Sequence, residues 1–445
     1  MKTIEKVGYG IGDLGAGVLW GMTSYVIVFL TDAVGLDAGL IGTMMLVIRV
    51  LDSLSDIIMG RIIDNTHTKI GKAKPWFLGS ILPLSLTTVL MFWIPESFSM
   101  PGKFIWATVF YFLMTCVFYT INSVAYNVLP ALITDNAKDQ VDMNVFRYFF
   151  SLSIAVVISA VTVPVVNSWG GIGHVPAWTK ITLIYAVIAT IALLLCGLSA
   201  KERISEKLEQ STVNEKKLPF LTALKYTFQN KYFILRLVGS LFGLLRVGVI
   251  GVAVYYATYI LGNSNLSGLL SIAFLLPMIF GVVLSPILVK KVGMQKSLII
   301  GSIVSTCGAL FALAFSNSLA FVLLGTAINA IGLGPGSACG AALGAQIADF
   351  GKWKHKVDLT GMTFSSVSFA IKVGTGIGTA MIGWGLAWSG YIAGAAVQTD
   401  ATIFVIKALF LFVPVLSSAI SIFTAMKMDI EYKIDDIRKE IAERE

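Results

Sequence analysis

The chain contains a succession of apolar runs, each about as long as a helix needs to cross a bilayer. A spanning helix takes roughly 20 mostly apolar residues, so this length suffices for roughly twelve of them. Of the 445 residues, 56% are hydrophobic and 13% are charged, about half the charged fraction of a soluble domain. We predict an all-α membrane protein with twelve transmembrane helices, near residues 8–31, 38–62, 76–95, 104–133, 146–168, 179–199, 231–261, 266–290, 297–315, 319–347, 359–388 and 401–427.

The one long charged stretch between these runs divides them into six and six. A weak internal repeat supports this division, because residues 135–142 and 349–358 both contain an aspartate that closes one run and a Val-Asp pair that opens the next. Two parallel six-helix halves are typical of rocking transporters with a site near the midplane. We predict an N-terminal half at 1–200, a cytoplasmic linker at 201–230, a C-terminal half at 231–427 and a cytoplasmic tail at 428–445.

Basic residues are concentrated in the loops of one predicted side. The opposite loops contain only Lys103, Lys180 and Lys407. The positive-inside rule therefore places both termini in the cytoplasm of a cell whose membrane the chain crosses many times. The net charge of +8 follows from this asymmetry and indicates contact with a lipid bilayer, with no nucleic acid as a partner.

Three charged residues interrupt the second apolar run. A charged side chain at the centre of a spanning helix costs roughly 2.5–3.5 kcal/mol on insertion scales, so it needs compensation or a function. Helical spacing places Arg49, Asp52 and Asp56 on one face, with Ser55 at its edge. This net negative column of hard oxygen ligands suits a proton or Na+. The alternative is a structural salt bridge that ties the helix to its neighbours.

The fourth apolar run has a polar face. Tyr119, Asn122, Ser123 and Tyr126 follow the spacing i, i+3, i+4 and i+7. Their hydroxyl, amide and aromatic groups suit the hydrogen bonds and C–H surface of a sugar, although a packing seam between helices also uses Asn and Ser. The candidates for the other walls of a sugar site are Trp20, Thr363 and Trp384. For the two tryptophans, interfacial anchoring or core packing is an equally good interpretation.

Short motifs recur from the first to the eleventh predicted span. They are GYGIGD at 8–13, LTD at 30–32, RVLDSLSDIIMGRIID at 49–64, GKAKPW at 71–76 and IADFG at 347–351, with Lys372 in the eleventh span. Together they resemble the glycoside–pentoside–hexuronide:cation symporters of the major facilitator superfamily, which include the melibiose and glucuronide permeases. The resemblance implies the major facilitator fold of two six-helix halves and cation-coupled uptake of a sugar by alternating access.

The resemblance also identifies the residues that would bind the coupling cation. The two carboxylates that bind it in such permeases match Asp52 and Asp56, and Ser55 stands where the melibiose permease pattern has an asparagine. A hydroxyl is a poorer Na+ ligand than an amide oxygen, so H+ and Na+ both stay open. Thr120 of the fourth span completes the expected cation site. No cofactor other than the coupling cation is implied.

Substrate and coupling residues follow from the same resemblance. Arg147 matches the family's arginine at the start of the fifth span, and Lys372 matches its lysine in the eleventh. Two sugar-binding aspartates of the melibiose type are missing, because their positions fall at Gly17 and Asn122. This argues against an α-galactoside and leaves a glycoside, pentoside or hexuronide.

The expected coupling role of Lys372 rests on its setting. It is the only basic residue inside the eleventh predicted span, where an unpaired ammonium is strongly disfavoured. We expect its side chain to face the transport cavity and to pair with a carboxylate. Together with Arg49, it would couple sugar binding to cation binding. A static salt bridge that only assembles the bundle is the alternative.

Two functions other than sugar symport are compatible with the same sequence. Movement of a lysolipid or drug through the same fold and a non-transporting sugar sensor are both open alternatives. An enzyme is not expected, since His67, His174 and His355 fall in or beside loops without ligand spacing. The four cysteines lie in apolar segments without a CxxC pair, so we expect all of them to be buried and to bind no metal.

Overall fold

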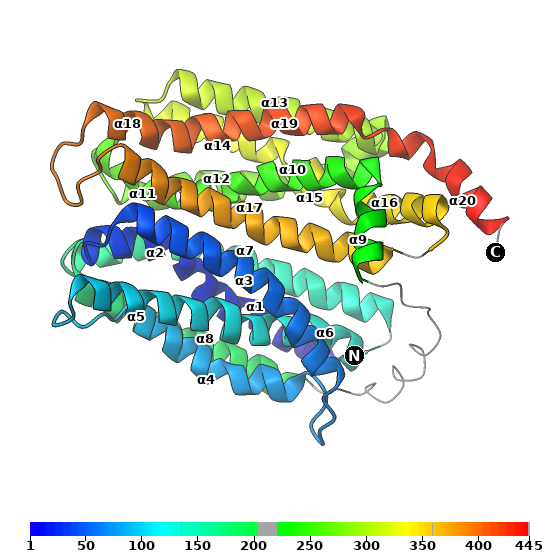
Figure 1. The fold of residues 1–445 in the computed structure, drawn as a ribbon, viewed down its shortest axis with the longest axis horizontal. Helices are drawn as coiled ribbons and strands as arrows, with labels where there is room; N and C mark the ends of the chain where they lie inside the picture. Colours follow the sequence, from blue (N-terminus) through cyan, green and yellow to red (C-terminus); the bar gives the residue numbers. More distant parts are fainter. Residues whose placement is uncertain (135, 201, 203–219, 358, 444–445) are drawn as a thin grey trace. The chain divides into compact units, whose positions relative to one another are not determined.

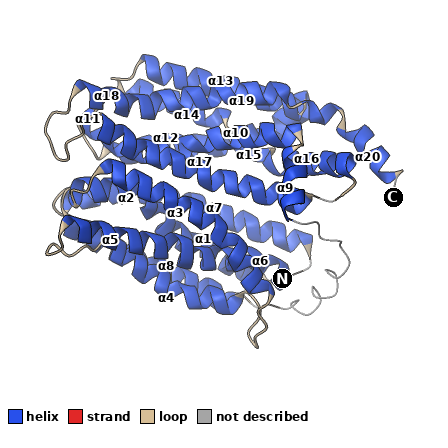
Figure 2. Ribbon diagram, viewed as in Figure 1, coloured by secondary structure: helices blue, strands red, loops and turns tan. Residues whose placement is uncertain are grey.

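The computed structural model describes residues 1–134, 136–200, 202, 220–357 and 359–443. Every regular element in this part of the chain is a helix (Figures 1 and 2). Ten segments are long and apolar enough to cross a membrane, which confirms the predicted all-α membrane class. They are Thr3–Ala33, Met100–Ile133, Lys138–Ser168, Val175–Ser199, Lys231–Tyr259, Leu266–Val292, Met294–Ala314, Leu319–Ala338, Gly361–Trp388 and Asp400–Tyr432.

Two further helices, α3 (Ala38–Asp64) and α4 (Lys74–Met91), are not among these ten. The charges of the Arg49–Asp56 column lower the apolar character of α3. Helix α4 is short and begins with the polar sequence Lys74-Pro75. Length and composition of the described residues therefore identify ten candidate spans, and the predicted number of twelve stays a prediction.

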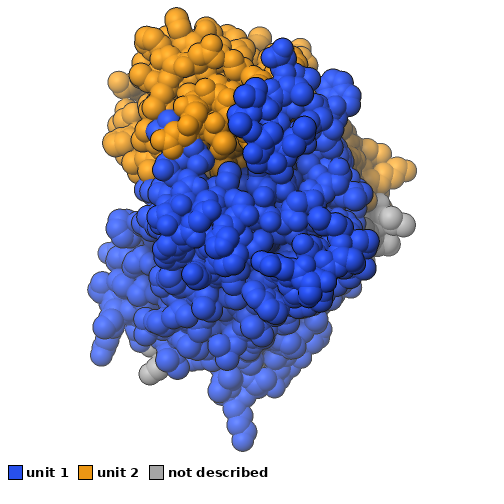
Figure 3. Space-filling view, turned by 90° about the vertical axis from the view of Figure 1, so that its left-hand side faces the viewer, with its two compact units in different colours: residues 1–215, 264–268, 383–402 blue, residues 216–263, 269–382, 403–445 orange. Residues whose placement is uncertain are grey.

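The chain divides into two compact units, coloured separately in Figure 3. Unit 1 comprises Met1–Glu215, Ser264–Gly268 and Gly383–Thr402, and unit 2 comprises Lys216–Asn263, Leu269–Ile382 and Ile403–Glu445. Part of the helix at 360–388 thus belongs to unit 1. The predicted boundaries at 200, 230 and 427 stay a prediction, and residues 201 and 203–219 of the predicted linker lie outside the described residues.

The early helices belong to unit 1. In it, α1 packs against α7 and α8, and α4 packs against α8 and α6. Besides α3 and α4, the helices in this part of the chain are α1 (Thr3–Met22), α2 (Val26–Val28), α5 (Met100–Phe112), α6 (Thr120–Ile133), α7 (Ala137–Ser168) and α8 (Val175–Ser199).

Most of the later helices belong to unit 2. In it, α13 packs against α14 and α19, and α10 packs against α19. The helices are α9 (Phe220–Phe228), α10 (Lys231–Gly248), α11 (Val252–Tyr259), α12 (Leu266–Val292), α13 (Met294–Ala314), α14 (Leu319–Gly332), α15 (Gly334–Ala338), α16 (Gly340–His355), α17 (Thr360–Trp388), α18 (Asp400–Lys407), α19 (Val413–Lys427) and α20 (Ile434–Ala442).

Several helical runs are locally irregular. Gly334-Pro335-Gly336 lies where α14 ends and α15 begins. Wider π-helical turns cover Phe29–Ala33, Leu113–Tyr119 and Ala408–Phe412. Such turns inside α-helices are frequent at functional sites.

The cysteines depart from expectation at one position. Cys116, Cys196 and Cys339 are buried, whereas Cys307 is exposed, so the prediction that all four are buried was wrong. Cys307 lies on the outer face of α13 between Ile303 and Leu310, which are also exposed. A thiol is apolar enough to share this face with aliphatic side chains.

The N-terminus of α4 is capped by the carboxylate of Glu202, which follows the end of α8. Three successive amides, those of residues 72–74, donate to Glu202 at 2.7, 3.0 and 2.7 Å. Gly71 has a φ of +120°, and a Cβ there would lie 2.3 Å from Glu202 Cδ, so glycine is needed for this close approach. A charge at this position also complements the helix dipole.

The N-terminus of α13 repeats this arrangement in unit 2. The amides of Met294 and Gln295 donate to the carboxylate of Glu431, each at 2.7 Å. A glycine with positive φ again directly precedes the donating amides, here Gly293 at +88°. Each unit therefore contains a glycine turn whose helix start is held by a glutamate distant in sequence.

We expect Glu202→Gln and Glu431→Gln each to destabilise the protein by about 1–3 kcal/mol, because each replaces charge-assisted hydrogen bonds by weaker neutral ones. Thermal denaturation of the purified protein measures the effect. Glu440→Gln is the control, since Glu440 accepts an exposed hydrogen bond from the Trp353 side chain rather than from the amides of a helix N-terminus. Melting temperatures equal to wild type for both cap variants would show that the caps contribute nothing.

Candidate cation and substrate site

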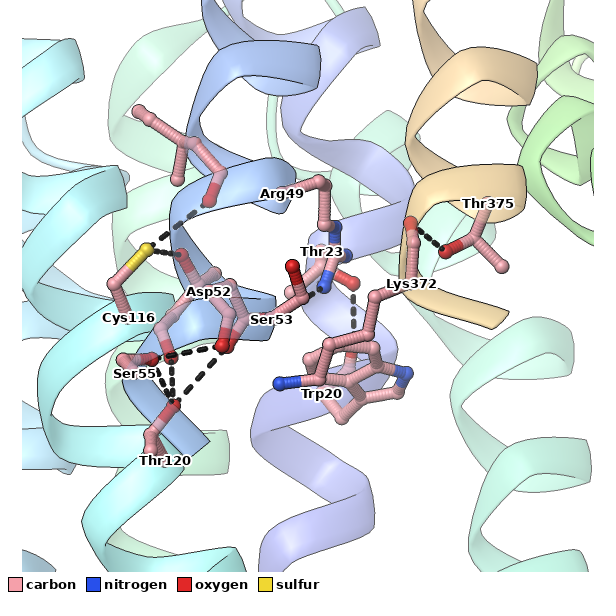
Figure 4. Close-up of polar contacts among 12 residues, drawn as sticks. Trp20, Thr23, Arg49, Asp52, Ser53, Ser55, Cys116, Thr120, Lys372 and Thr375 are labelled. Carbon is pink, nitrogen blue, oxygen red and sulfur yellow. Dashed lines mark hydrogen bonds and ion pairs between the residues drawn. The ribbon is translucent and has the colours of Figure 1, made fainter. Parts of the chain in front are cut away.

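Three of the predicted cation residues lie together in unit 1, namely Asp52 and Ser55 of α3 and Thr120 of α6 (Figure 4). Asp52 is almost fully buried, at 1% exposure, and its Oδ2 lies 3.8 Å from Arg49 Nη1. Thr120 donates its hydroxyl to Asp52 Oδ1 at 3.0 Å. Ser55 Oγ lies 3.1 Å from Thr120 Oγ1 and donates to the Asp52 carbonyl at 2.8 Å. Carboxylate and hydroxyl oxygens thus converge at one point.

Asp56 is half-buried, one helical turn beyond Asp52 on α3. Residues four apart share a helical face, so α3 presents both carboxylates in the same direction. Oxygen donors of this kind suit a proton or a Na+ ion. No group of three or more His, Cys, Asp or Glu side chains that could hold a metal occurs among the residues that the structure describes.

The π-helical turn at Leu113–Tyr119 positions Thr120. The Thr120 hydroxyl also lies 3.2 Å from the carbonyl oxygen of Thr115, five residues earlier. Within the same turn, Cys116 Sγ donates to the Ile48 carbonyl of α3 at 3.1 Å. The wide turn is therefore fastened to α3 and directs Thr120 at Asp52.

An aromatic pair lies beside this column. The Arg49 guanidinium carbon is 4.4 Å from the ring centroid of Trp20 in α1, within the range of a cation–π contact. The Trp20 and Tyr119 rings are in turn 4.5 Å apart. Two predicted substrate residues thus contact the predicted cation column through Arg49.

A second polar cluster lies between α1, α6 and α7. Arg147 Nε donates to Asp13 Oδ2 at 2.8 Å, and its guanidinium lies 4.6 Å from the Tyr126 ring. Tyr126 and Tyr9 stack and exchange hydrogen bonds, each hydroxyl donating to the other's carbonyl at 2.8 and 3.1 Å. The Tyr126 hydroxyl, a predicted sugar contact, is therefore already used within the protein.

Sequence reasoning missed Asp13 and Tyr9 as members of this cluster. The available signal was a carboxylate inside an apolar run, in the GYGIGD motif at 8–13. Spacing along one helix does not identify a partner such as Arg147 on another. The pairing therefore became visible only in the structure.

Asn122 lies at the contact between α6 and α4. It is buried and donates Nδ2 to Ser80 Oγ at 3.0 Å. Its Oδ1 has no hydrogen-bond partner among the described residues. The contact with α4 favours the packing-seam alternative for Asn122, while its role in sugar binding stays a prediction.

The remaining predicted residues are spread along α17. Thr363 is buried near the start of the helix, and Lys372 is half-buried further along it. Trp384, near the other end, belongs to unit 1 and donates Nε1 to Thr43 Oγ1 of α3 at 2.9 Å. Thr363 and Trp384 are separated by about 30 Å along the helix axis, so they do not form one wall.

Comparisons with known proteins agree with this architecture. A bacterial homologue of the human lysosomal transporter Spinster, in an inward-facing and unoccupied conformation, superposes with a TM-score of 0.66 at 12% identity, covering 97% of each chain. The isoprimeverose transporter of Lactiplantibacillus pentosus is 29% identical over 97% of this chain and 89% of its own. A putative glycoside/cation symporter of Escherichia coli is 28% identical over 99% of this chain and 94% of its own.

The family model described as MFS/sugar transport protein matches residues 8–432, nearly the whole chain. The chain therefore belongs to this family and, within the major facilitator superfamily, to the glycoside–pentoside–hexuronide:cation symporters that its motifs resemble.

Proposed function

We propose that the protein is a secondary active transporter that couples the uptake of a glycoside, pentoside or hexuronide to H+ or Na+. The carrying observation is the buried network of Asp52, Thr120 and Ser55, joined through Arg49 to Trp20. The relatives named for isoprimeverose transport and for glycoside/cation symport support the sugar and the cation. The family consists of transporters, which confirms that the chain is not an enzyme.

Coupling requires that the cation change the protein's interaction with the sugar. The cation neutralises part of the negative charge of Asp52 and Asp56, which otherwise attracts Arg49. Arg49 also contacts Trp20, which packs against Tyr119. The position of Arg49 therefore links the charge of α3 to this aromatic wall of Trp20 and Tyr119. We assign coupling to Arg49 and, from its setting in α17, to Lys372.

We assign the sugar site to Trp20, Tyr119 and Arg147, with Tyr126 supporting the Arg147 side chain. Aromatic faces pack on the C–H surface of a sugar, and a guanidinium donates to hydroxyl or carboxylate oxygens. This polar lining favours a sugar over a lysolipid or drug. Asn122, Thr363 and Trp384 are the weaker candidates for the sugar site.

Gly17 occupies one of the two positions where the melibiose type has a sugar-binding aspartate. A Cβ at Gly17 would lie 2.7 Å from Ile154 Cγ2, so an acidic side chain there requires Ile154 to move.

We also propose that α3 and α4 cross the membrane, which gives twelve spans in two six-helix halves. Helix α3 has 27 residues and is about 40 Å long, more than a hydrocarbon core of about 30 Å requires. It exposes an apolar stripe, consistent with a lipid-facing surface, at Leu40, Val47, Leu51, Leu54 and Ile58. The halves are 1–200 and 231–427, and both termini are cytoplasmic.

We expect Asp56→Asn to abolish accumulation driven by an imposed cation gradient while leaving downhill sugar exchange, because one of two coupling carboxylates is lost. Uptake and counterflow of isoprimeverose in proteoliposomes, with Na+ and pH gradients applied separately, separate these activities. Asp37→Asn on the same helix is the control, since asparagine preserves the N-cap that Asp37 provides to Leu40. Normal accumulation by Asp56→Asn would exclude the assignment.

We expect Arg147→Lys to lower sugar affinity about tenfold and cation affinity by less than threefold. Lysine keeps the positive charge, but it lacks the planar guanidinium that can donate to Asp13 and to a ligand at the same time. Calorimetric titration of isoprimeverose, and of Na+ or protons, gives both affinities for each protein. Cation affinity falling as much as sugar affinity would contradict a specific substrate role.

Asn122→Ala tests the contact between α6 and α4 in the same assay. If Asn122 binds the sugar, sugar affinity falls more than cation affinity, because the lost hydrogen bonds belong to the solute. Equal and small losses for both ligands would show that Asn122 only packs against Ser80.

A further inference from the structure

A second buried cation lies in unit 2, far along the sequence from the site described above. Arg246 of α10 is 7% exposed, and its Nη1 donates to Asn329 Oδ1 of α14 at 2.8 Å. Its guanidinium carbon lies 5.2 Å from the ring centroid of Phe274. No carboxylate among the described residues forms an ion pair with Arg246, and its Nε has no hydrogen-bond partner there.

Such an arrangement leaves a charge uncompensated. A guanidinium has five N–H donors, and the Asn329 amide oxygen that accepts from Arg246 is neutral. Burying an unpaired charge in an apolar region is strongly unfavourable unless an opposite charge accepts its hydrogen bonds. The chemistry of the site therefore calls for an anionic group.

The surrounding helices hold Arg246 in place. Asn329 Nδ2 donates to the Ser305 carbonyl at 2.7 Å and to its hydroxyl at 2.9 Å. Ser305 Oγ lies 3.0 Å from Ser418 Oγ of α19. Helices α13 and α14 approach closely at Gly308, which has no side chain. An added Cβ there would lie only 2.3 Å from the Asn329 amide nitrogen. The acceptor of Arg246 is thus fixed by three helices.

Arg246 lines a pocket within unit 2. The pocket is partly open to the exterior and offers about 50 Å³ to the centres of water-sized molecules, which is room for a few waters and limits a ligand to a small molecule. Asn329 and Thr326 add polar groups, whereas most of the remaining wall is apolar and includes Phe274 and Phe410. This composition differs from the aromatic and charged clusters in unit 1.

We propose that this pocket binds a small organic monocarboxylate. The carboxylate accepts a pair of hydrogen bonds from the Arg246 fork, for which its planar geometry is suited. The apolar remainder of the ligand packs against Phe274 and Phe410. The site is separate from the residues that we assign to sugar and cation, and it requires neither of those ligands.

Benzoate is the probe, because it combines a carboxylate with an aromatic ring. Benzamide has the same shape without the charge, and chloride is an anion without the apolar part. Binding to the purified full-length protein is followed by thermal shift and ligand-observed NMR. We expect benzoate to bind at least tenfold more tightly than benzamide and chloride, and Arg246→Met to lower benzoate affinity at least tenfold.

Arg236→Met is the matched control, since Arg236 lies on the same helix and does not line the pocket. It should retain benzoate binding. Ile250→Trp fills the pocket without removing the charge and should also abolish binding, so it replaces Arg246→Met if that variant does not fold. The proposal is wrong if benzoate does not bind, if benzamide or chloride binds equally well, or if the pocket variants bind benzoate like wild type.

Discussion

The burial of the Asp52 carboxylate is the constraint around which unit 1 is organised. An ionised carboxylate in an apolar helix bundle needs an opposite charge and hydrogen bonds, and it has Arg49 at 3.8 Å and the Thr120 hydroxyl at 3.0 Å. The π-helical turn at Leu113–Tyr119 brings Thr120 into reach. Arg49 extends the network to Trp20, so the charge balance of α3 is transmitted to the aromatic wall.

Much of the fold followed from the sequence because apolar run length and helical spacing are local properties. The same spacing placed Arg49, Asp52 and Asp56 on one face of α3, and the structure places these residues on a single helix. Ser55 and Thr120, both named for the predicted cation site, lie 3.1 Å apart, while their role in cation binding stays a prediction. The agreements between sequence and structure concern helical runs and residues that share one helix.

The missed features are pairings between distant helices. Tyr126 and Asn122 lie on one predicted polar face, yet Tyr126 bonds to α1 and Asn122 to α4. Helical periodicity indicates which residues share a face but not which neighbour that face meets. The lack of a carboxylate beside Arg246 among the described residues was equally hidden, although a basic residue inside an apolar run was a visible signal.

The two units repeat one arrangement at a helix N-terminus. Gly71 with Glu202 and Gly293 with Glu431 perform the same task at the starts of α4 and α13. The glycine and the glutamate of each pair are separated by more than a hundred residues. Each cap therefore closes its own unit by joining an early helix to the end of a late one.

Reciprocal binding measurements test cation-coupled sugar symport most directly. Sugar affinity is measured with and without saturating Na+, and at two pH values without Na+, using isoprimeverose, methyl glycosides and a glucuronide. Cation affinity is then measured with and without the sugar that binds. The account predicts that one cation raises sugar affinity and that the sugar raises the affinity for that cation by the same factor. Sugar binding that is indifferent to both cations, or no binding by any of these sugars, would contradict it.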